Sequence, residues 1–303
     1  MMFSSLSRLA IGARTLRSRC RWSATLLVLA AWFAPLTSSR AQSEPGDTAA
    51  RMATLAAADV LLLGEQHDAP AHQQIAREVV QWLAARQQLA ALVLEMLPAG
   101  RSSAGLKPDT SVDQTRQTLA WDDRAWPWQA YGPIVMAAVQ AGVPVLGGNL
   151  AMDALRASMA RRELDQRLPA PALARQQTLM REGHCGLLPE SQIGPMTRMQ
   201  IARDLSLATT VQEAARSAKP NQRVLLISGS VHADKALGVP QHLPNQLNAL
   251  SVRLLVQGAD PSGGSFDAHW PTAPAPATDY CAGLREQFKA RSNAQTPPAP
   301  ARP

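Results

Sequence analysis

The chain has 303 residues, and its 30 lysines and arginines outnumber 23 acidic residues to give a formal net charge of +7. This excess lies almost entirely at the start: the first 41 residues contain six arginines and no acidic residue, which leaves 24 basic against 23 acidic residues in the remainder. A nucleic-acid-binding surface needs clustered basic residues. The nearly neutral remainder has no such cluster, so we exclude a nucleic-acid-binding protein.

The N-terminal segment has the pattern of a secretory signal peptide. Basic residues precede the apolar run SATLLVLAAWFAPL, and the small residues Ser39 and Ala41 occupy positions −3 and −1 of a cleavage site. The apolar run is shorter than the roughly 20 residues that a membrane-spanning helix needs. Cys20 precedes this run, so we do not expect a lipoprotein. We predict a periplasmic or secreted protein whose signal peptide, residues 1–41, is cleaved after Ala41.

Five apolar runs along the remaining chain are typical of buried parallel strands. They are residues 58–64, 89–96, 143–150, 223–229 and 250–258. Helical patterns lie between them, at residues 71–88 and 131–142 and throughout 151–218. Strands that alternate with helices form βαβ units.

We therefore predict an α/β fold, with a parallel Rossmann-like sheet flanked by helices. Residues 151–218 are expected to form a helical insert or lid. The folded domain is expected at residues 42–287, and the proline- and alanine-rich residues 288–303 are expected to be a disordered tail.

Polar residues follow four of the five apolar runs. Glu65 and His67 follow the first, Glu95 ends the second, Asn149 ends the third and His232 follows the fourth. Each could simply cap a helix or bond to a loop. However, ligands bind beyond the carboxyl ends of parallel strands, and two separate Gly-x-x-His turns after apolar strands favour one shared site.

Two cysteines remain beyond the signal peptide, Cys185 and Cys281. In an oxidising compartment two such cysteines are expected to form a disulfide. The alternative is a pair of buried free thiols, because sequence alone does not show whether the two residues come within bonding distance.

Five sequence blocks resemble the ChaN-like haem-binding uptake family of the Tiki, TraB and erythromycin-esterase-like superfamily. The blocks are GEQHD with His72, LEM, WPWQAYGPIVMAAVQAGVPVLGGNL, GHCGLLPE followed by Gln200 and RDLSLA, and SGSVHADKALGVPQHL. The resemblance implies a Rossmann-like sheet with a helical subdomain, an envelope location, and haem binding linked to haem and iron uptake. Some members of the family are lipoproteins, and Gly147-Gly148-Asn149 replaces a less glycine-rich turn.

Haem needs an axial iron ligand, an apolar slot and cations for its propionates. We consider Tyr131 and His184 as axial ligands, although core packing is the alternative for Tyr131 and its neighbouring tryptophans. The further candidates for the haem site are two methionines that could line the slot and two arginines that could bind propionates: Met180, Met196, Arg181 and Arg198.

A metal-dependent hydrolase is the competing hypothesis. Glu65, His67, Glu95 and His232 could hold a divalent metal ion, or serve as the acid and base of an esterase or peptidase. The sequence contains no HExxH helix, P-loop or GxSxG turn. We therefore favour a haem-binding protein over an enzyme, with a homodimer and an outer-membrane haem receptor system as candidate partners.

Overall fold

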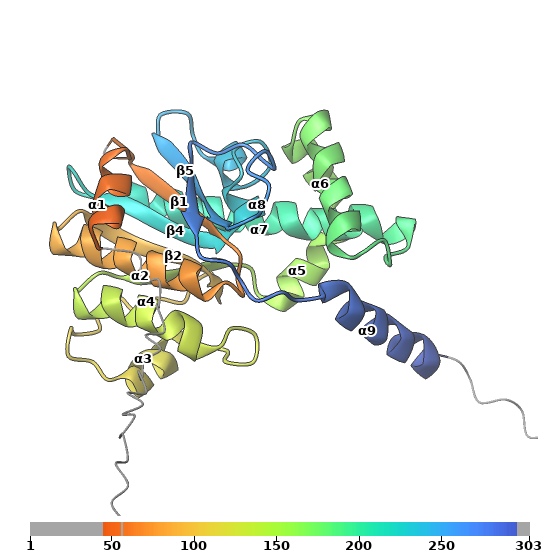
Figure 1. The fold of residues 1–303 in the computed structure, drawn as a ribbon, viewed down its shortest axis with the longest axis horizontal. Helices are drawn as coiled ribbons and strands as arrows, with labels where there is room; N and C mark the ends of the chain where they lie inside the picture. Colours follow the sequence, from red (N-terminus) through yellow and green to blue (C-terminus); the bar gives the residue numbers. More distant parts are fainter. Residues whose placement is uncertain (1–44, 56, 296–303) are drawn as a thin grey trace, which may run out of the picture. The chain divides into compact units, whose positions relative to one another are not determined.

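The computed structural model describes residues 45–55 and 57–295, and Figure 1 shows their arrangement as a single sheet flanked by helices. The strands are β1 (Val60–Glu65), β2 (Leu89–Pro98), β3 (Val145–Asn149), β4 (Arg223–Gly229), β5 (Ala249–Val256) and β6 (Ala268–Thr272). The predicted signal peptide and its cleavage site lie outside the described residues, as do residues 296–303.

The helices connect these strands or follow them. They are α1 (Pro45–Ala53), α2 (Pro70–Ala85), α3 (Val112–Leu119), α4 (Trp128–Gln140), α5 (Met152–Ser158), α6 (Ala170–Gly183), α7 (Glu190–Arg216), α8 (Ser230–Ala233) and α9 (Tyr280–Gln295), with 3₁₀ turns η1 (Arg162–Arg167) and η2 (Val239–His242). Within the described part of the chain, every helix is too short or too polar to cross a bilayer.

All six strands run parallel, in the order β3-β2-β4-β1-β5-β6. The central strand β1 pairs with β4 on one side and with β5 on the other, so the carboxyl ends of β1, β2 and β4 meet at one edge. The connections that leave β1 and β4 pack on opposite faces of the sheet, through α2 and α8. Such a change of face opens a crevice beyond the strand ends. The predicted α/β fold is confirmed.

Helices bury both faces of the sheet. In β1, Leu61 and Leu63 face a core shared with α2 and α4, whereas Val60 and Leu62 face a second core shared with α7 and α8. Successive side chains of a strand point to opposite faces, so a strand covered on both sides reads as an unbroken apolar run. This double coverage explains why the central strands were recognisable from sequence.

The region predicted as a helical insert has two roles in the structure. Its first part consists of α5, η1, α6 and the first half of α7. The last three share a small core around Leu164 and Ile201, and α5 packs against α7. The second half of α7 instead covers the sheet, where Leu207 and Val211 are fully buried in the second core. Only the first part, which we call the helical subdomain, is separate from the sheet.

Gly148 in β3 leaves room for this packing. A Cβ atom at that position would lie 2.7 Å from the Leu207 Cδ2 atom and 3.0 Å from the Val93 Cγ1 atom. Contacts of that length force side chains or backbone to shift. Gly148, which lies in strand β3 and not in a turn, thus permits the close approach of α7.

The two edge strands are both protected. Residues 101–103 cover the outer edge of β3, where Ser103 N–H donates to the Val145 carbonyl and Gly147 N–H donates to the Arg101 carbonyl. The other edge, β6, contains Pro271, which has no N–H to donate. Strand β6 was not predicted from the sequence, because Trp270 is its only buried residue.

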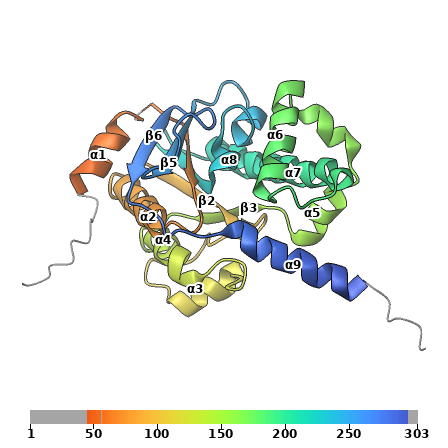
Figure 2. The ribbon, with the colours of Figure 1, turned by 45° about the vertical axis from the view of Figure 1, so that its right-hand side comes forward.

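The C-terminal end of the fold differs from the expectation of a disordered tail from residue 288. Helix α9 continues to Gln295. Figure 2 shows this helix, in dark blue, outside the helical layers that cover the sheet.

We predict that Leu207→Ala lowers the free energy of unfolding by about 2–5 kcal/mol, because it leaves a cavity between α7 and the sheet. Val112→Ala is the control, since Val112 is 43% exposed and its truncation is expected to change stability by less than about 0.5 kcal/mol. Urea unfolding measures both. Equal, small effects would contradict the assignment of α7 to the sheet.

Candidate functional site

The buried carboxylate of Glu95, which follows the last β2 residue paired with β4, lies at the centre of a polar cluster. Its Oε2 atom accepts a hydrogen bond of 2.8 Å from the Gly229 N–H at the end of β4. Its Oε1 atom lies 3.5 Å from His232 Nε2 and 3.7 Å from Arg203 Nη1. His67 Nε2 lies 3.9 Å from Oε2. One carboxylate therefore faces three basic side chains.

A second buried carboxylate orients His232. Asp204, on α7, lies with Oδ1 2.6 Å from His232 Nδ1, and both side chains are buried. The adjacent Arg203 donates from Nε to the Asn149 Oδ1 atom at 3.1 Å, and Asn149 Nδ2 donates to the Glu95 carbonyl at 3.0 Å. These bonds connect α7 to the ends of β2 and β3.

Glu65 orients His67 in the same way. The Glu65 Oε1 atom lies 2.9 Å from His67 Nδ1 and also accepts the Tyr131 hydroxyl at 2.6 Å. Gln73 Nε2 donates to the Glu65 Oε2 atom at 3.2 Å, and the ring of Trp126 packs edge-on against His67 with centroids 4.8 Å apart. His67 is thereby held between two carboxylates.

We call these residues, Glu65, His67, Glu95, Arg203, Asp204 and His232, the strand-end cluster. Burial alone would raise the pKa of Glu95, but His232, His67 and Arg203 together hold it below its ordinary value. Burial alone would lower the pKa of each histidine, but hydrogen bonding and charge from the surrounding carboxylates raise the pKa of both. Burial raises the pKa of Asp204, although His232 opposes the shift. The arrangement favours charged imidazolium rings facing Glu95.

Gly229 leaves room for this arrangement. A Cβ atom at that position would lie 3.0 Å from His67 Nε2 and 3.6 Å from the Glu95 Oε2 atom. The glycine of the second Gly-x-x-His turn therefore allows His67 to approach the β4 end, in addition to starting the turn to His232.

His72, which follows the block GEQHD, has a structural position. It is fully buried, and its Nδ1 atom accepts the Gln66 N–H at 2.9 Å. Burial lowers the pKa of His72 to about 4. Its neutral ring supports the loop that presents His67.

A cleft of about 610 Å³ opens between the strand ends and the helical subdomain. The cluster residues His67, Glu95 and Arg203 form one wall. Apolar side chains also line it, Leu179 and Met180 from the helical subdomain and Val231 from α8. His184 and Tyr280 complete this part of the lining with a ring nitrogen and a hydroxyl group. This volume is in the range of small-molecule and cofactor sites.

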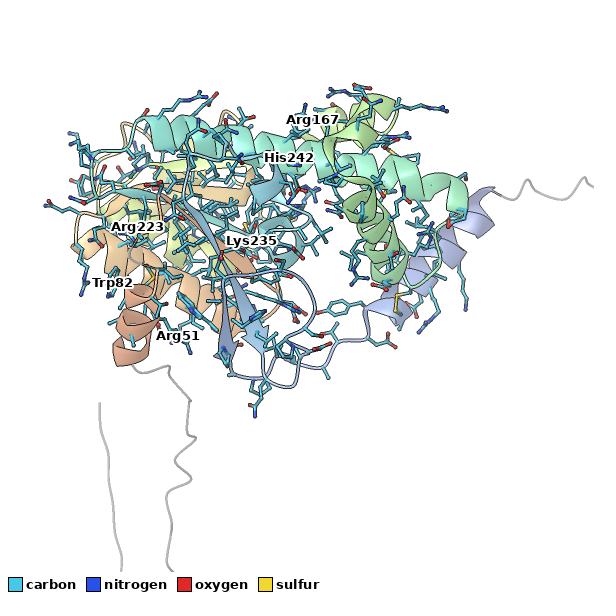
Figure 3. All side chains as sticks on the ribbon, turned by 90° about the horizontal axis from the view of Figure 1, so that it is seen from above. Arg51, Trp82, Arg167, Arg223, Lys235 and His242 are labelled. Atoms are coloured by element: carbon cyan, nitrogen blue, oxygen red, sulfur yellow. A yellow bond between two sulfur atoms is a disulfide. The ribbon has the colours of Figure 1, made fainter. Side chains whose placement is uncertain are left out.

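A disulfide joins Cys185 to Cys281, with Cα atoms 5.8 Å apart across a sequence separation of 96 residues. Figure 3 draws such a bond in yellow. The disulfide expectation is thus confirmed over the free-thiol alternative. It links the end of α6 to the start of α9 and so brings His184 and Tyr280, the preceding neighbours of the two cysteines, to the same cleft.

Tyr131 has a different position from the one expected of an iron ligand. It is 1% exposed, does not line the cleft, and donates its hydroxyl to Glu65. Burial and the charge of Glu65 raise its pKa, so the phenol keeps its proton. Tyr131 supports the strand-end cluster, as its core-packing alternative implied.

The two arginines expected to bind propionates are paired with carboxylates outside the cleft lining. Arg181 Nε lies 2.6 Å from Glu190 Oε1, and Arg198 makes two bonds to Asp165, of 2.9 and 2.7 Å. Of the two methionines, Met180 lines the cleft and Met196 does not. Arg203 is the arginine that lines it.

The roles of four of these residues were not predicted from the sequence: Arg203, Asp204, Gln73 and Tyr280. Arg203 and Asp204 lie within the block RDLSLA, but on a helix, where no strand-end rule applied. The available signal for Tyr280 was its position next to Cys281, once that cysteine is paired with Cys185.

We predict that Glu95→Gln lowers the pKa of both His67 and His232 and costs about 1–3 kcal/mol of stability, because the carboxylate charge that they face is lost. The histidines' raised pKa values stabilise the fold fully below their ordinary value of 6.5, and this stabilisation is lost as pH rises through the folded pKa. The lowered pKa of Glu95 also stabilises the fold. This stabilisation is fully present above the ordinary value of 4.5 and is lost as pH falls through the folded pKa.

The difference in the free energy of unfolding between wild type and Glu95→Gln should accordingly be largest between about pH 4.5 and 6.5. NMR titration of the imidazoles and chemical unfolding at several pH values measure the two effects. Glu163→Gln is the control, because that carboxylate is exposed and forms its ion pair with the surface residue Arg161, away from the strand-end cluster. Unchanged histidine pKa values in Glu95→Gln would contradict the coupling.

Comparisons with known proteins identify a family and a fold. Residues 51–243 match the family model described as haem-binding uptake, Tiki superfamily, ChaN. No curated protein matches the chain. Among solved structures, ChaN of Campylobacter jejuni, described as binding haem cofacially, superposes with a TM-score of 0.58 at 21% identity, over 70% of this chain and 87% of that one.

Two other solved structures superpose less well. The type III effector HopBA1 has a TM-score of 0.45 at 14% identity, over 77% of this chain and 94% of that one. An erythromycin esterase EreC mutant has a TM-score of 0.45 at 13% identity, over 73% of this chain and 78% of that one. The family match covers well over half of the chain and the fold is that of ChaN: the chain belongs to the ChaN family of haem-binding uptake proteins in the Tiki superfamily.

Proposed function

We propose that the protein binds haem in the cleft between the strand ends and the helical subdomain. The observation that carries the proposal is the cleft itself, which lies mostly within the region matched by the haem-binding family and combines an apolar wall with a polar wall that contains Arg203. The structure of ChaN from Campylobacter jejuni is described as binding haem. The proposal extends that ligand to this chain.

The residues present fit the chemical needs of haem. Leu179, Met180 and Val231 offer apolar surface to the porphyrin, and the Arg203 guanidinium offers a cation to a propionate. The His184 Nδ1 atom lies 2.9 Å from the Met180 carbonyl oxygen, so Nε2 is the ring nitrogen that could contact a ligand. Bound haem would supply an iron centre, and the chain would hold it, orient it and keep part of it from water.

We further propose that the protein is exported and takes part in haem and iron uptake, with residues 1–41 as its cleaved signal peptide. The Cys185–Cys281 disulfide supports export, since disulfides persist mainly in oxidising compartments. A homodimer and an outer-membrane haem receptor system are the partners that this role would use.

The hydrolase alternative has less support. Among the described residues, no three histidine, cysteine, aspartate or glutamate side chains converge in an arrangement that could hold a metal ion. The ring nitrogens of His67 and His232 all face carboxylates at 2.6–3.9 Å. This geometry favours an internal role for the cluster, in fixing the strand ends.

We predict that residues 42–303 bind haemin saturably, with a shift of the Soret band that reaches a defined stoichiometry. Spectrophotometric titration measures this, and haemin added to a carrier protein of no haem specificity is the control. A spectrum identical to that control, without saturation, would contradict the proposed function.

We also predict that Arg203→Gln weakens haemin binding, because it removes the cation that faces the propionates. The cost should be about 1.5–3 kcal/mol, the value of a hydrogen bond to a charged group. Arg181→Gln is the matched control, since Arg181 pairs with Glu190 outside the cleft lining.

The dimethyl ester of haemin separates propionate binding from damage to the fold. Its carboxylates are blocked, so Arg203→Gln and wild type should bind it almost equally. Equal weakening for haemin and its ester would show that Arg203 acts only through the strand-end cluster.

A further inference from the structure

A second cavity, also of about 610 Å³, adjoins the cleft and shares Leu179, Ser230 and Val231 with it. The rest of its lining comes from the N-terminal half of α6, the segment that follows α8, and the loop between β5 and β6. The residues of the strand-end cluster are absent from this lining. The second cavity is therefore a separate space, and the haem proposal leaves it without a ligand.

Apolar side chains form most of the wall of the second cavity. They are Pro169, Pro171, Ala172, Leu179, Val231, Ala236, Leu237 and Phe266. Phe266 provides the one aromatic ring among these lining residues. Flat aromatic ligands gain from stacking or edge contacts with aromatic side chains, whereas an aliphatic chain needs only apolar surface to leave water. The lining therefore favours a ligand with an aliphatic body.

Hydrogen bonds hold the loop between β5 and β6 in place as one wall of this cavity. The buried Asp234 carboxylate accepts the N–H groups of Ala236 at 2.8 Å and of Ser265 at 3.2 Å. Lys235 N–H donates to the Ser265 carbonyl at 2.9 Å. Gly264 has a φ of +104°, and a Cβ atom there would lie 2.6 Å from Asp234 Oδ2. The wall is thus preformed, and the carboxylate in it already has donors.

Arg253, on β5, supplies a half-buried cation to the cavity. Its Nη1 atom donates to the carbonyl oxygens of Asp260, at 3.2 Å, and of Gly263. Among the described residues, its Nε and Nη2 atoms have no hydrogen-bond acceptor and no carboxylate forms an ion pair with it. These two parallel donors match the two oxygens of a carboxylate.

Arg175 is the other arginine in the lining, and it is already paired. It is exposed, and its Nη1 atom lies 3.6 Å from the Glu182 Oε2 atom. An exposed guanidinium with a carboxylate partner adds little to the binding of a second anion. Arg253 is therefore the cation that remains for a ligand of this cavity.

We propose that the second cavity binds a free long-chain carboxylic acid, with its carboxylate against Nε and Nη2 of Arg253 and its aliphatic chain among the apolar side chains. The acid is a second ligand, of a class different from haem, and its site needs no bound haem. Burial of the chain supplies the affinity, and the paired donors of Arg253 select a carboxylate over an uncharged headgroup.

Calorimetric titration with decanoate, and with decanol as the uncharged analogue of equal chain length, tests the role of Arg253. Wild type should bind one decanoate per chain and should bind decanol more weakly. Arg253→Gln should weaken decanoate binding roughly 10- to 100-fold and leave decanol binding unchanged. Arg175→Gln is the matched control, and it should change decanoate affinity by less than about fivefold.

Two further variants locate the bound acid. Ala236 lines the second cavity but not the cleft, and it is exposed and outside the described cores. Ala236→Trp should therefore fill the cavity and weaken both decanoate and decanol binding at least tenfold, while circular dichroism and haemin binding stay as in wild type. Arg203→Gln, in the cleft, should bind decanoate as wild type does.

Four outcomes would overturn this proposal. The first is an absence of saturable decanoate binding by wild type, and the second is wild-type decanoate affinity in both Arg253→Gln and Ala236→Trp. The third is weaker decanoate binding in Arg203→Gln, which would place the acid in the cleft. The fourth is equal weakening of decanoate and decanol by Arg253→Gln, which would show that Arg253 only supports the loop. These measurements use no haem, so a failure of haemin binding leaves their result standing.

Discussion

The arrangement of the strand ends depends on the burial of one carboxylate. Glu95 is 3% exposed and follows the last β2 residue paired with β4, and its side chain faces groups from β4, from the loop after β1, from α8 and from α7. A buried carboxylate without compensation is very costly, whereas one with several donors and cations can remain charged. The elements that contribute those donors must therefore keep their relative positions. This requirement fixes one wall of the cleft.

The opposite wall is built on a different physical basis. It consists of side chains from the helical subdomain, whose small core is separate from the two cores of the sheet. The subdomain joins the sheet through α7, which begins in one core and ends in the other. A polar wall fixed by hydrogen bonds thus faces an apolar wall that belongs to a subdomain with a core of its own. Such a division suits a ligand with a large apolar face and charged edges.

The sequence predicted the strands that are buried on both faces of the sheet. The run Val60–Leu63 is apolar because both faces of β1 are covered, and the polar residues beyond it had to lie at the strand ends. Strand β6 did not follow the rule, because it has one buried side chain and a proline. The boundary of the helical subdomain was also missed, since the apolar stripe of α7 continues along its length while its packing partner changes.

The site residues at the ends of parallel strands were predictable, because the sheet brings those ends together. Glu65, His67, Glu95 and His232 come together because parallel strands end at one edge. Asp204 and Arg203 reach them from a helix, and helical periodicity does not say which strand end a helix crosses. Tyr280 arrives through a bond between residues 96 apart in sequence. Local patterns carry no information on such a contact.

The edges of the sheet have a consequence for the solubility of the chain. An open edge presents a row of N–H and C=O groups on which another chain can add a strand, the first step towards aggregation. At β3 that row is occupied by residues 101–103, and at β6 it is interrupted by Pro271. A sheet of six parallel strands, slow to assemble because its pairings are distant in sequence, thereby ends on both sides in surfaces that resist pairing with a second copy.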